Sequence, residues 1–389
     1  MDSGILLSVV ATSRNDNHGG SLTFRMQHFV DGFVEQCRRH QLRAELILVE
    51  WNPPSDRPPL RNALRFPENT DSCEIKIITV PADVHNKMEG SQHLPLYQMI
   101  AKNVGIRRAR GRFVLATNID ILFSDQVIRL MRDELVPGKL YRVNRFDVPP
   151  DVPVMDSFDK TLAYCDKTAF RVHRITDSYV RHGRRWVGVS RRTSLLRHGF
   201  ELLAAIAAKE GAAWSNLGNT PIARKLIIRS QSLAEAAWRW FKRVVWKIRH
   251  RIKLHVFREV PHTNACGDFT LMSRADWSAL RGYPEWQIFS WHLDSILLYQ
   301  AMYAGIRELD LPDRYAIYHI EHGVGSGYTP EGASELFSRL SRVGLRYLTD
   351  GDVQRLVGEM KAMRKDGRRT VYNDEQWGLA SESFHEQRL

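Results

Sequence analysis

The stretch that decides the fold is GRFVLATNIDILF, residues 111–123. Its apolar run, Phe113–Ala116, has the length and composition of a strand buried on both faces of a sheet. The run ends at the polar triplet Asn118, Ile119 and Asp120, after which apolar residues resume. An unpaired buried carboxylate is costly, whereas a carboxylate at a strand end can hold a divalent cation together with phosphate oxygens. The stretch therefore predicts a sheet with a ligand site at Asp120.

Strands and helices alternate along the chain on either side of this stretch. Apolar runs predict strands over 5–12, 45–51, 75–80, 140–146 and 315–320, and helical spacing predicts helices over 22–41, 96–110, 333–348 and 353–365. This alternation is typical of an α/β fold with a mainly parallel, Rossmann-like sheet covered by helices, in which ligands bind beyond the carboxyl ends of the strands. No Gly-x-Gly-x-x-Gly or P-loop pattern follows a strand, which argues against dinucleotide oxidoreductases and P-loop NTPases.

Composition narrows the class of protein. The 389 residues are 43% hydrophobic, enough for one large domain with elaborations. A net charge of +12 favours an anionic partner such as a nucleotide or an acidic membrane surface. The four cysteines show no metal-ligand or disulfide spacing. Neither a signal peptide nor an apolar run of about 18 residues is visible, so we expect a cytoplasmic protein, soluble or peripheral to the inner face of a membrane.

The strand and turn at Asn118 and Asp120 resemble the metal-binding turn of GT-A glycosyltransferases, and family 2 is the suspected branch. In that fold an Asp-x-Asp turn holds Mn²⁺ or Mg²⁺ on the diphosphate of a nucleotide-sugar. Here Asn118, a weaker metal ligand, stands in place of the first Asp. The resemblance implies that Asp120 binds metal and diphosphate with Asn118 in support.

The opening segment VATSRNDNHGG, residues 10–20, also resembles the first strand and loop of GT-A enzymes. That resemblance implies that Thr12, Arg14 and Asp16 contact the nucleotide-sugar and that Glu50, at the end of the second strand, contacts its base or ribose. Two structural alternatives remain. Asp16 suits a helix cap, and Glu50 suits an ion pair with a nearby arginine.

Two later segments resemble the acceptor half of the same fold. Residues 264–285 match a Gly-Asp-rich strand followed by a helix, which implies nucleotide-sugar contacts for Gly267 and Asp268. Residues 291–294 match the segment that carries the acceptor-side carboxylate, which implies that Asp294, preceded by His292, acts as the base of an inverting reaction. A helix N-cap is the alternative role for Asp294.

His319, Glu321 and His322 form the densest group of potential metal ligands, just before a glycine-rich loop over 323–327. GT-A enzymes often supply a C-terminal histidine to the metal. The resemblance therefore implies His322 or His319 as a ligand that compensates for Asn118, with His322 preferred because His319 also suits a core position.

A basic, aromatic segment over 233–257 predicts an amphipathic helix with its apolar residues on one face. A helix at an anionic membrane surface is favoured, a helix packed on the domain is the alternative, and a nucleic-acid contact is disfavoured. The chain divides into a nucleotide-sugar half over 1–150, a variable region with this basic insertion over 151–260, an acceptor half over 261–330 and a helical tail over 331–389.

These expectations combine into one hypothesis about function. The chain is expected to be a hexosyltransferase-like glycosyltransferase that moves a sugar from a nucleotide-diphosphate donor to a hydroxyl of a glycan or lipid-linked acceptor, as in polysaccharide biosynthesis. Two alternatives stay open: a non-catalytic, membrane-associated scaffold of the same fold, and a sugar-1-phosphate nucleotidyltransferase.

Overall fold

The computed structural model describes residues 4–67, 71–154, 156–175, 177–183, 185–188, 260–322 and 333–389. The chain divides into two compact units, Met1–Gly188 with Pro261–Leu389, and Val189–Val260. Apart from Val260, the described residues belong to the first unit. The basic helix expected over 233–257 and the glycine-rich loop over 323–327 lie outside the described residues.

The larger sheet has eight strands in the spatial order β12-β6-β11-β4-β1-β2-β3-β14. In that order the strands are Arg307–Asp310, Lys139–Arg142, Phe269–Ser273, Phe113–Thr117, Leu7–Ser13, Ala44–Trp51, Cys73–Val80 and His385–Arg388. β1, β2, β3 and β4 run parallel, β12 runs parallel to β6, and β11 and β14 pair antiparallel with their neighbours. The α/β class and the mainly parallel sheet are therefore confirmed.

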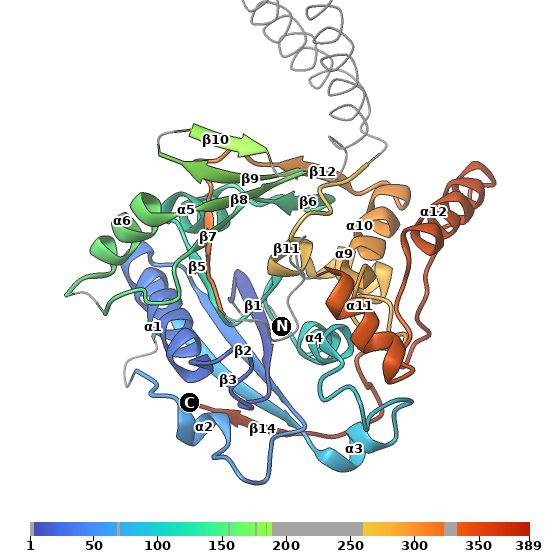
Figure 1. The fold of residues 1–389 in the computed structure, drawn as a ribbon, viewed down its shortest axis with the longest axis horizontal. Helices are drawn as coiled ribbons and strands as arrows, with labels where there is room; N and C mark the ends of the chain where they lie inside the picture. Colours follow the sequence, from blue (N-terminus) through green and yellow to red (C-terminus); the bar gives the residue numbers. More distant parts are fainter. Residues whose placement is uncertain are drawn as a thin grey trace, which may run out of the picture. The chain divides into compact units, whose positions relative to one another are not determined.

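Helices cover both faces of this sheet because β1, β2 and β4 are mostly apolar, are buried along their whole length and need a packing partner on each side. Figure 1 shows α1 and α4 on opposite sides of the central strands. On one face lie α1 (Leu22–His40) and α5 (Asp125–Asp133), and on the other lie α4 (Gln98–Arg107), α9 (Arg274–Leu280) and α10 (Leu293–Tyr303). Serine N-caps begin two of them, because Ser124 accepts from the Val127 N–H and Ser273 from the Asp276 N–H.

A second, smaller sheet has six strands in the order β10-β9-β8-β7-β13-β5. In that order the strands are Arg185–Gly188, Asp177–His182, Arg171–Arg174, Arg145–Val148, Ile317–Ile320 and Ile121–Phe123. Its central strands alternate, with Phe146, Val172 and Ile320 packed in an apolar cluster and polar residues at the positions between them. α6 (Phe158–Thr168) packs against the apolar face through Leu162 and Cys165.

The second sheet differs from the sequence prediction in two places. The strand expected over 140–146 divides in two, because Tyr141 belongs to β6 in the larger sheet and Phe146 belongs to β7 in the second sheet. The region after Asp156, which shows no clear period in the sequence, contains α6, β8, β9 and β10.

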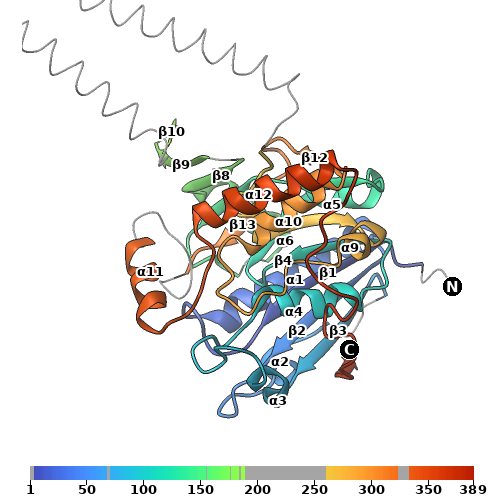
Figure 2. The same ribbon diagram turned by 90° about the vertical axis from the view of Figure 1, so that its right-hand side faces the viewer.

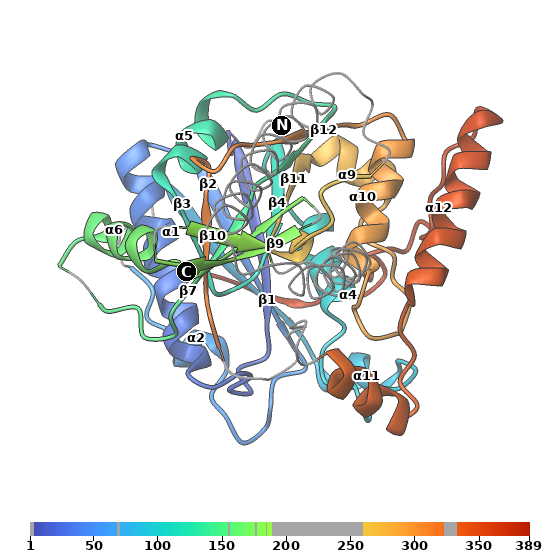
Figure 3. The same cartoon turned by 45° about the horizontal axis from the view of Figure 1, so that its top comes forward.

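The C-terminal tail contains the expected helices and also a strand. α11 (Ala333–Arg342) precedes α12 (Asp350–Lys365), which lies at the outer edge beyond α10 (Figures 2 and 3) and packs through Leu356 and Met360. β14 then pairs antiparallel with β3 and extends the larger sheet by one strand. Arg108 fixes the approach to β14 by donating to the carbonyl oxygens of Gly378 and Glu382.

Three short helices complete the described residues. They are α2 (Leu60–Ala63), α3 (Ala82–Asn86) and the 3₁₀ turn Cys266–Asp268. The 3₁₀ turn leads directly into β11, so it brings Asp268 to the level of the end of β4, where Thr117 donates to the Asp268 carbonyl oxygen.

Candidate active site in the cleft beyond the strand ends

A cleft of about 650 Å³ opens at the carboxyl ends of β1, β4 and β13. Its lining contains the arginines Arg14, Arg25, Arg145, Arg171 and Arg339, the histidines His18, His93, His319 and His322, and the carboxylates Asp16, Asp120, Asp268 and Glu321. Such a cleft, cationic but with carboxylates on its floor, suits an anionic ligand that binds with the help of a metal ion. Its position agrees with the rule that ligands of parallel sheets bind beyond the carboxyl ends of the strands.

Most of the residues singled out in the sequence meet here. Those that line the cleft are Thr12, Arg14, Asp16, Asn118, Asp120, Asp268, His319 and His322. They come from four separate parts of the chain, namely the end of β1, the turn between β4 and β5, the 3₁₀ turn before β11, and the end of β13.

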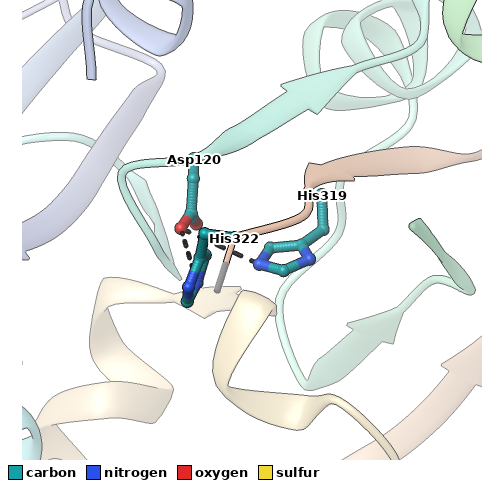
Figure 4. Close-up of side chains that lie close together, drawn as sticks. All are labelled: Asp120, His319 and His322. Carbon is teal, nitrogen blue, oxygen red and sulfur yellow. Dashed lines mark ion pairs between the residues drawn. The ribbon is translucent and has the colours of Figure 1, made fainter. Parts of the chain in front are cut away.

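Asp120, His319 and His322 converge on one point of the cleft floor (Figure 4). The Oδ2 atom of Asp120 lies 3.8 Å from Nε2 of His319 and 3.5 Å from Nε2 of His322. The potential ligand atoms of the three residues all lie within 4.8 Å of one another. The turn after β4 carries Asp120 and the end of β13 carries the histidines, because β13 pairs with β5 immediately after that turn.

The residues present fit a divalent cation. Asp120 is buried, and among the described residues its Oδ1 atom has no hydrogen-bond partner. A buried carboxylate oxygen without a partner is unfavourable unless a cation or donor joins it. One carboxylate with two imidazoles suits Mn²⁺ or Zn²⁺ better than Mg²⁺, which prefers oxygen ligands.

Arg25 on α1 balances the charge of the Asp120 carboxylate. Its Nη1 atom lies 2.7 Å from Oδ2 of Asp120, and both side chains are almost fully buried. Nη2 of Arg25 donates to the carbonyl oxygens of His18 and Gly20, which ties the loop after β1 to the same point. Arg25 occupies Oδ2 and leaves Oδ1 for a ligand.

The loop after β1 also holds His322 in place. Gly19 has φ +70°, and a Cβ atom at this position would lie 2.4 Å from Nδ1 of His322. A side chain at residue 19 would therefore displace His322 from the cleft, and the positive φ favours glycine independently. Gly19 is needed for the close approach between the first loop and the end of β13.

Asn118 does not join this group of potential ligands. Its Oδ1 atom accepts from Nε2 of Gln98 and from Nζ of Lys102, both at 2.9 Å, and its Nδ2 atom donates to Asp268. Lys102 is buried and also donates to the Gly267 carbonyl oxygen at 2.7 Å. Burial lowers the pKa of Lys102 to about 8. Asn118 thus links α4 to the 3₁₀ turn with both ends of its amide.

The polar face of the second sheet forms one wall of the cleft. Alternation places Arg145, Asp147, Arg171, His173 and His319 on this face across three adjacent strands. Asp147 is fully buried and lies 2.9 Å from Nε of Arg145 and 3.0 Å from Nε2 of His173. Nη1 of Arg145 reaches the Asp268 carboxylate at 2.7 Å. The wall is a connected network of ion pairs, so its side chains are held rigidly.

Charges in this wall shift the pKa values of its members. Burial is the largest influence and would raise the pKa of Asp147 and Asp268, but Arg145 and the neighbouring histidines together hold both pKa values below their usual range. Burial and Arg145 disfavour the charged form of His319, yet Asp120 and Asp147 together raise its pKa above the ordinary value. Because their pKa values are lowered, Asp147 and Asp268 are ionised at neutral pH.

Four residues predicted for the site do not line the cleft. Glu50 is buried and accepts from the Leu60 N–H and from Thr79, so it holds the loop before α2. His292 pairs with the exposed Asp350 at 3.1 Å. The other two, Gly267 and Asp294, lie close together, since a Cβ on Gly267 would lie 3.1 Å from Oδ2 of Asp294. Oδ1 of Asp294 accepts from the Ser295 N–H at the start of α10.

The sequence analysis named Arg14 but missed the other arginines that line the cleft. Arg25 lies in a helix that the sequence predicts well, but its pairing with Asp120 spans 95 residues and leaves no local signal. Arg145 and Arg171 lie on short strands, RFDV and RVHR, in which polar and apolar residues alternate. This alternation was the signal that could have identified them.

Comparisons with known proteins reveal similarity to solved structures, but none to a protein family or a curated protein. Among solved structures, the crystal structure of GalNAc-T7 with UDP, GalNAc and Mn²⁺ is similar at 12% sequence identity and a TM-score of 0.42. The similarity covers 95% of this chain and 56% of that chain, so the present chain corresponds to little more than half of that protein.

Within the part of the chain that the structure describes, no helix is both long and apolar enough to cross a membrane.

Proposed function

We propose that the chain is a nucleotide-sugar-dependent glycosyltransferase of GT-A type whose donor binds in the cleft. The observation that carries the proposal is the buried carboxylate of Asp120. Its Oδ2 atom lies close to His319 and His322, and its Oδ1 atom has no hydrogen-bond partner among the described residues. Arginines surround this point in the cleft lining. A cation beside a carboxylate, with guanidinium groups around it, is the environment that a diphosphate needs.

In this proposal the protein stabilises the departing nucleoside diphosphate. A bound Mn²⁺ would supply a Lewis acid for the diphosphate, held by Asp120, His319 and His322. Arg171 and Arg145 line the cleft on the wall next to His319 and offer guanidinium donors to phosphate oxygens. Because these groups are fixed by the ion-pair network, they need no rearrangement when charge develops on the leaving group.

An inverting reaction needs a base for the acceptor hydroxyl, and a carboxylate that lines the cleft can serve as one. Asp294 does not line the cleft, Asp268 is paired with Arg145, Asp120 is assigned to the cation, and Asp16 belongs to the loop assigned to the nucleotide-sugar. Glu321 follows His319 by two residues, lines the cleft and keeps 28% of its side chain exposed. We therefore assign the base role to Glu321 rather than Asp294, and we retain a glycan or glycolipid as acceptor on the sequence resemblance alone.

The test measures nucleoside diphosphate release from a panel of nucleotide-sugars with Mn²⁺ present. Wild type is expected to release diphosphate from one donor, and Asp120→Asn to reduce the rate about 100- to 1,000-fold because the diphosphate loses its cation. Asp313→Asn is the matched control, since Asp313 pairs with Arg174 and Asn144 and does not line the cleft. A control variant that loses as much activity as Asp120→Asn would overturn the assignment of the site.

The same panel separates the alternatives. Pyrophosphate release from a nucleoside triphosphate and a sugar 1-phosphate would favour the nucleotidyltransferase. Nucleotide binding detected by thermal stabilisation, with no turnover of any donor, would favour the non-catalytic scaffold.

A further inference from the structure

His319 belongs to two overlapping groups of potential metal ligands. One consists of Asp120, His319 and His322, and the other of Asp147, His319 and Glu321. Nε2 of His319 faces Asp120, and its Nδ1 lies 3.3 Å from Oδ1 of Asp147. The imidazole ring of His319 therefore lies between the carboxylates of Asp120 and Asp147. If a cation binds at one of the two groups, the carboxylate of the other group must have a different role.

The sheet register explains why Asp147 and His319 lie side by side. β7 and β13 run parallel, and Asp147 is the direct partner of His319 in the ladder. Direct partners on neighbouring strands project from the same face of the sheet. On the other side of β13 the partner of His319 is Ile121, which leads back to the turn that carries Asp120.

The charges around the two groups differ in kind. Asp147 lies 2.9 Å from Nε of Arg145, 3.6 Å from Nη1 of Arg171 and 3.0 Å from Nε2 of His173. A divalent cation beside Asp147 would meet two guanidinium charges in a buried place, which is electrostatically unfavourable. Asp120 contacts one guanidinium, that of Arg25, through Oδ2, while its Oδ1 has no partner among the described residues.

We propose that Asp147 is a positioning residue for the cation site. It accepts a hydrogen bond from the Nδ1–H of His319, which fixes the tautomer and turns the Nε2 lone pair toward a cation shared with Asp120 and His322. Oδ1 of Asp147 lies 3.3 Å from Nδ1 of His319 and 2.9 Å from Nε of Arg145. Nδ1 of His319 is buried and has no hydrogen-bond partner among the described residues, so Asp147 is the carboxylate placed to accept its proton. A carboxylate that orients a metal-binding histidine in this way raises the affinity of the site. The inference rests on the proposed cation site.

The test compares the Mn²⁺ affinity of wild type, Asp147→Asn and Glu321→Gln, measured by electron paramagnetic resonance of free Mn²⁺. Asp147→Asn is expected to weaken binding about 10- to 100-fold. Glu321→Gln, the control from the second group, is expected to change affinity less than about twofold. A purely structural role for Asp147 would lower the unfolding temperature in EDTA without changing the affinity of the folded protein. Equal affinity in Asp147→Asn and wild type, or an equal loss in Glu321→Gln, would overturn the proposal.

A second measurement covers the case in which Asp147→Asn fails to fold. Wild type labelled with ¹⁵N-histidine is titrated with Zn²⁺, and the His319 signal is assigned by its loss in His319→Gln. We expect Zn²⁺ on Nε2 and a proton on Nδ1. Zn²⁺ on Nδ1 would contradict the proposed orientation.

Failure of this inference and failure of the proposed function give different results. A chain that binds Mn²⁺ with the expected dependence on Asp147 but releases no nucleoside diphosphate retains the positioning role and loses the transferase assignment. A chain that releases nucleoside diphosphate but binds no cation retains the transferase assignment, and the role of Asp147 is then wrong.

Discussion

The two sheets of this protein differ in the side chains that their two faces carry. In the larger sheet, β1, β2 and β4 are buried along their whole length, and helices pack on both faces. In the second sheet, β7, β8 and β13 bury one face in a small apolar cluster and turn arginine, aspartate and histidine toward the cleft. The larger sheet thus contributes mainly to the stability of the fold, and the second sheet supplies charged side chains to the site.

Buried carboxylates show the same contrast. Glu50, at the end of β2, has neutral hydrogen-bond partners, and burial raises its pKa. Asp147 and Asp268 beside the second sheet are as deeply buried, but Arg145 lowers the pKa of both. A carboxylate with neutral partners suits a structural role, whereas one held ionised among arginines suits the recognition of charge.

The largest expected effect compares one leucine in each sheet. Leu115 in β4 and Leu122 in β5 are both almost fully buried, but Leu122 belongs to the smaller apolar cluster. Leu115→Ala should lower the free energy of unfolding by about 4–5 kcal/mol and Leu122→Ala by about 2–3 kcal/mol, because the cost depends on how well the site collapses. Urea unfolding of the two variants measures both values.

The control for this comparison is Val154→Ala, since Val154 is 82% exposed. Its unfolding free energy should stay within about 0.5 kcal/mol of wild type. If Leu122→Ala costs more than Leu115→Ala, the larger sheet is not the main source of stability.

The difference between the sheets also explains what the sequence could predict. Continuous apolar runs, such as Ile75–Val80, stand out against polar loops, so the strands and helices of the larger sheet are readable. The second sheet is built from strands of three to six residues whose alternation is brief, and Arg171–Arg174 carries a single apolar residue. So short a pattern does not differ from that of a polar loop.

The residues of the candidate site also differ in how far the sequence could predict them. Asp120, His319 and His322 follow apolar strands, so their positions at strand ends were predictable from the sequence. The pairing of Arg25 with Asp120 and of Asp147 with His319 depends on contacts over 95 and 172 residues, which no local pattern encodes. Asp268, at the end of the 3₁₀ turn Cys266–Asp268, lines the cleft, whereas the base role of Asp294, which lies close to Gly267 in the same turn, stays a prediction.

The next largest effect concerns Arg171 in the second sheet, where a substitution should change nucleotide affinity but not stability. Arg171→Ala should weaken the binding of a nucleoside diphosphate by about 1.5–3 kcal/mol, the usual contribution of a hydrogen bond to a charged group. Its unfolding free energy should change little, because Arg171 is 20% exposed and its ion-pair distances are 3.6 and 3.9 Å. Isothermal titration calorimetry measures the affinity.

Arg174→Ala serves as the matched control for Arg171→Ala. Arg174 lies on the same strand but pairs with Asp313 and does not line the cleft. An equal loss of affinity in both variants would show that net positive charge, rather than the polar face of the second sheet, attracts the nucleotide.

The smallest effect concerns Glu50, where the contrast between neutral and charged partners becomes a pH dependence. Because burial raises the pKa of Glu50 in the folded state, its ionisation costs stability above that pKa, and the cost disappears as the pH falls below the ordinary glutamate value. Glu50→Gln keeps an acceptor for the Leu60 N–H and removes the charge. The variant should therefore match or exceed wild-type stability by up to about 1 kcal/mol at pH 7 and lose this advantage near pH 4. Nucleotide affinity should not change, because Glu50 does not line the cleft. A variant that is less stable at pH 7, or that binds nucleotide more weakly, would mean that Glu50 acts as a charged group in the site, as Asp147 and Asp268 do beside the second sheet.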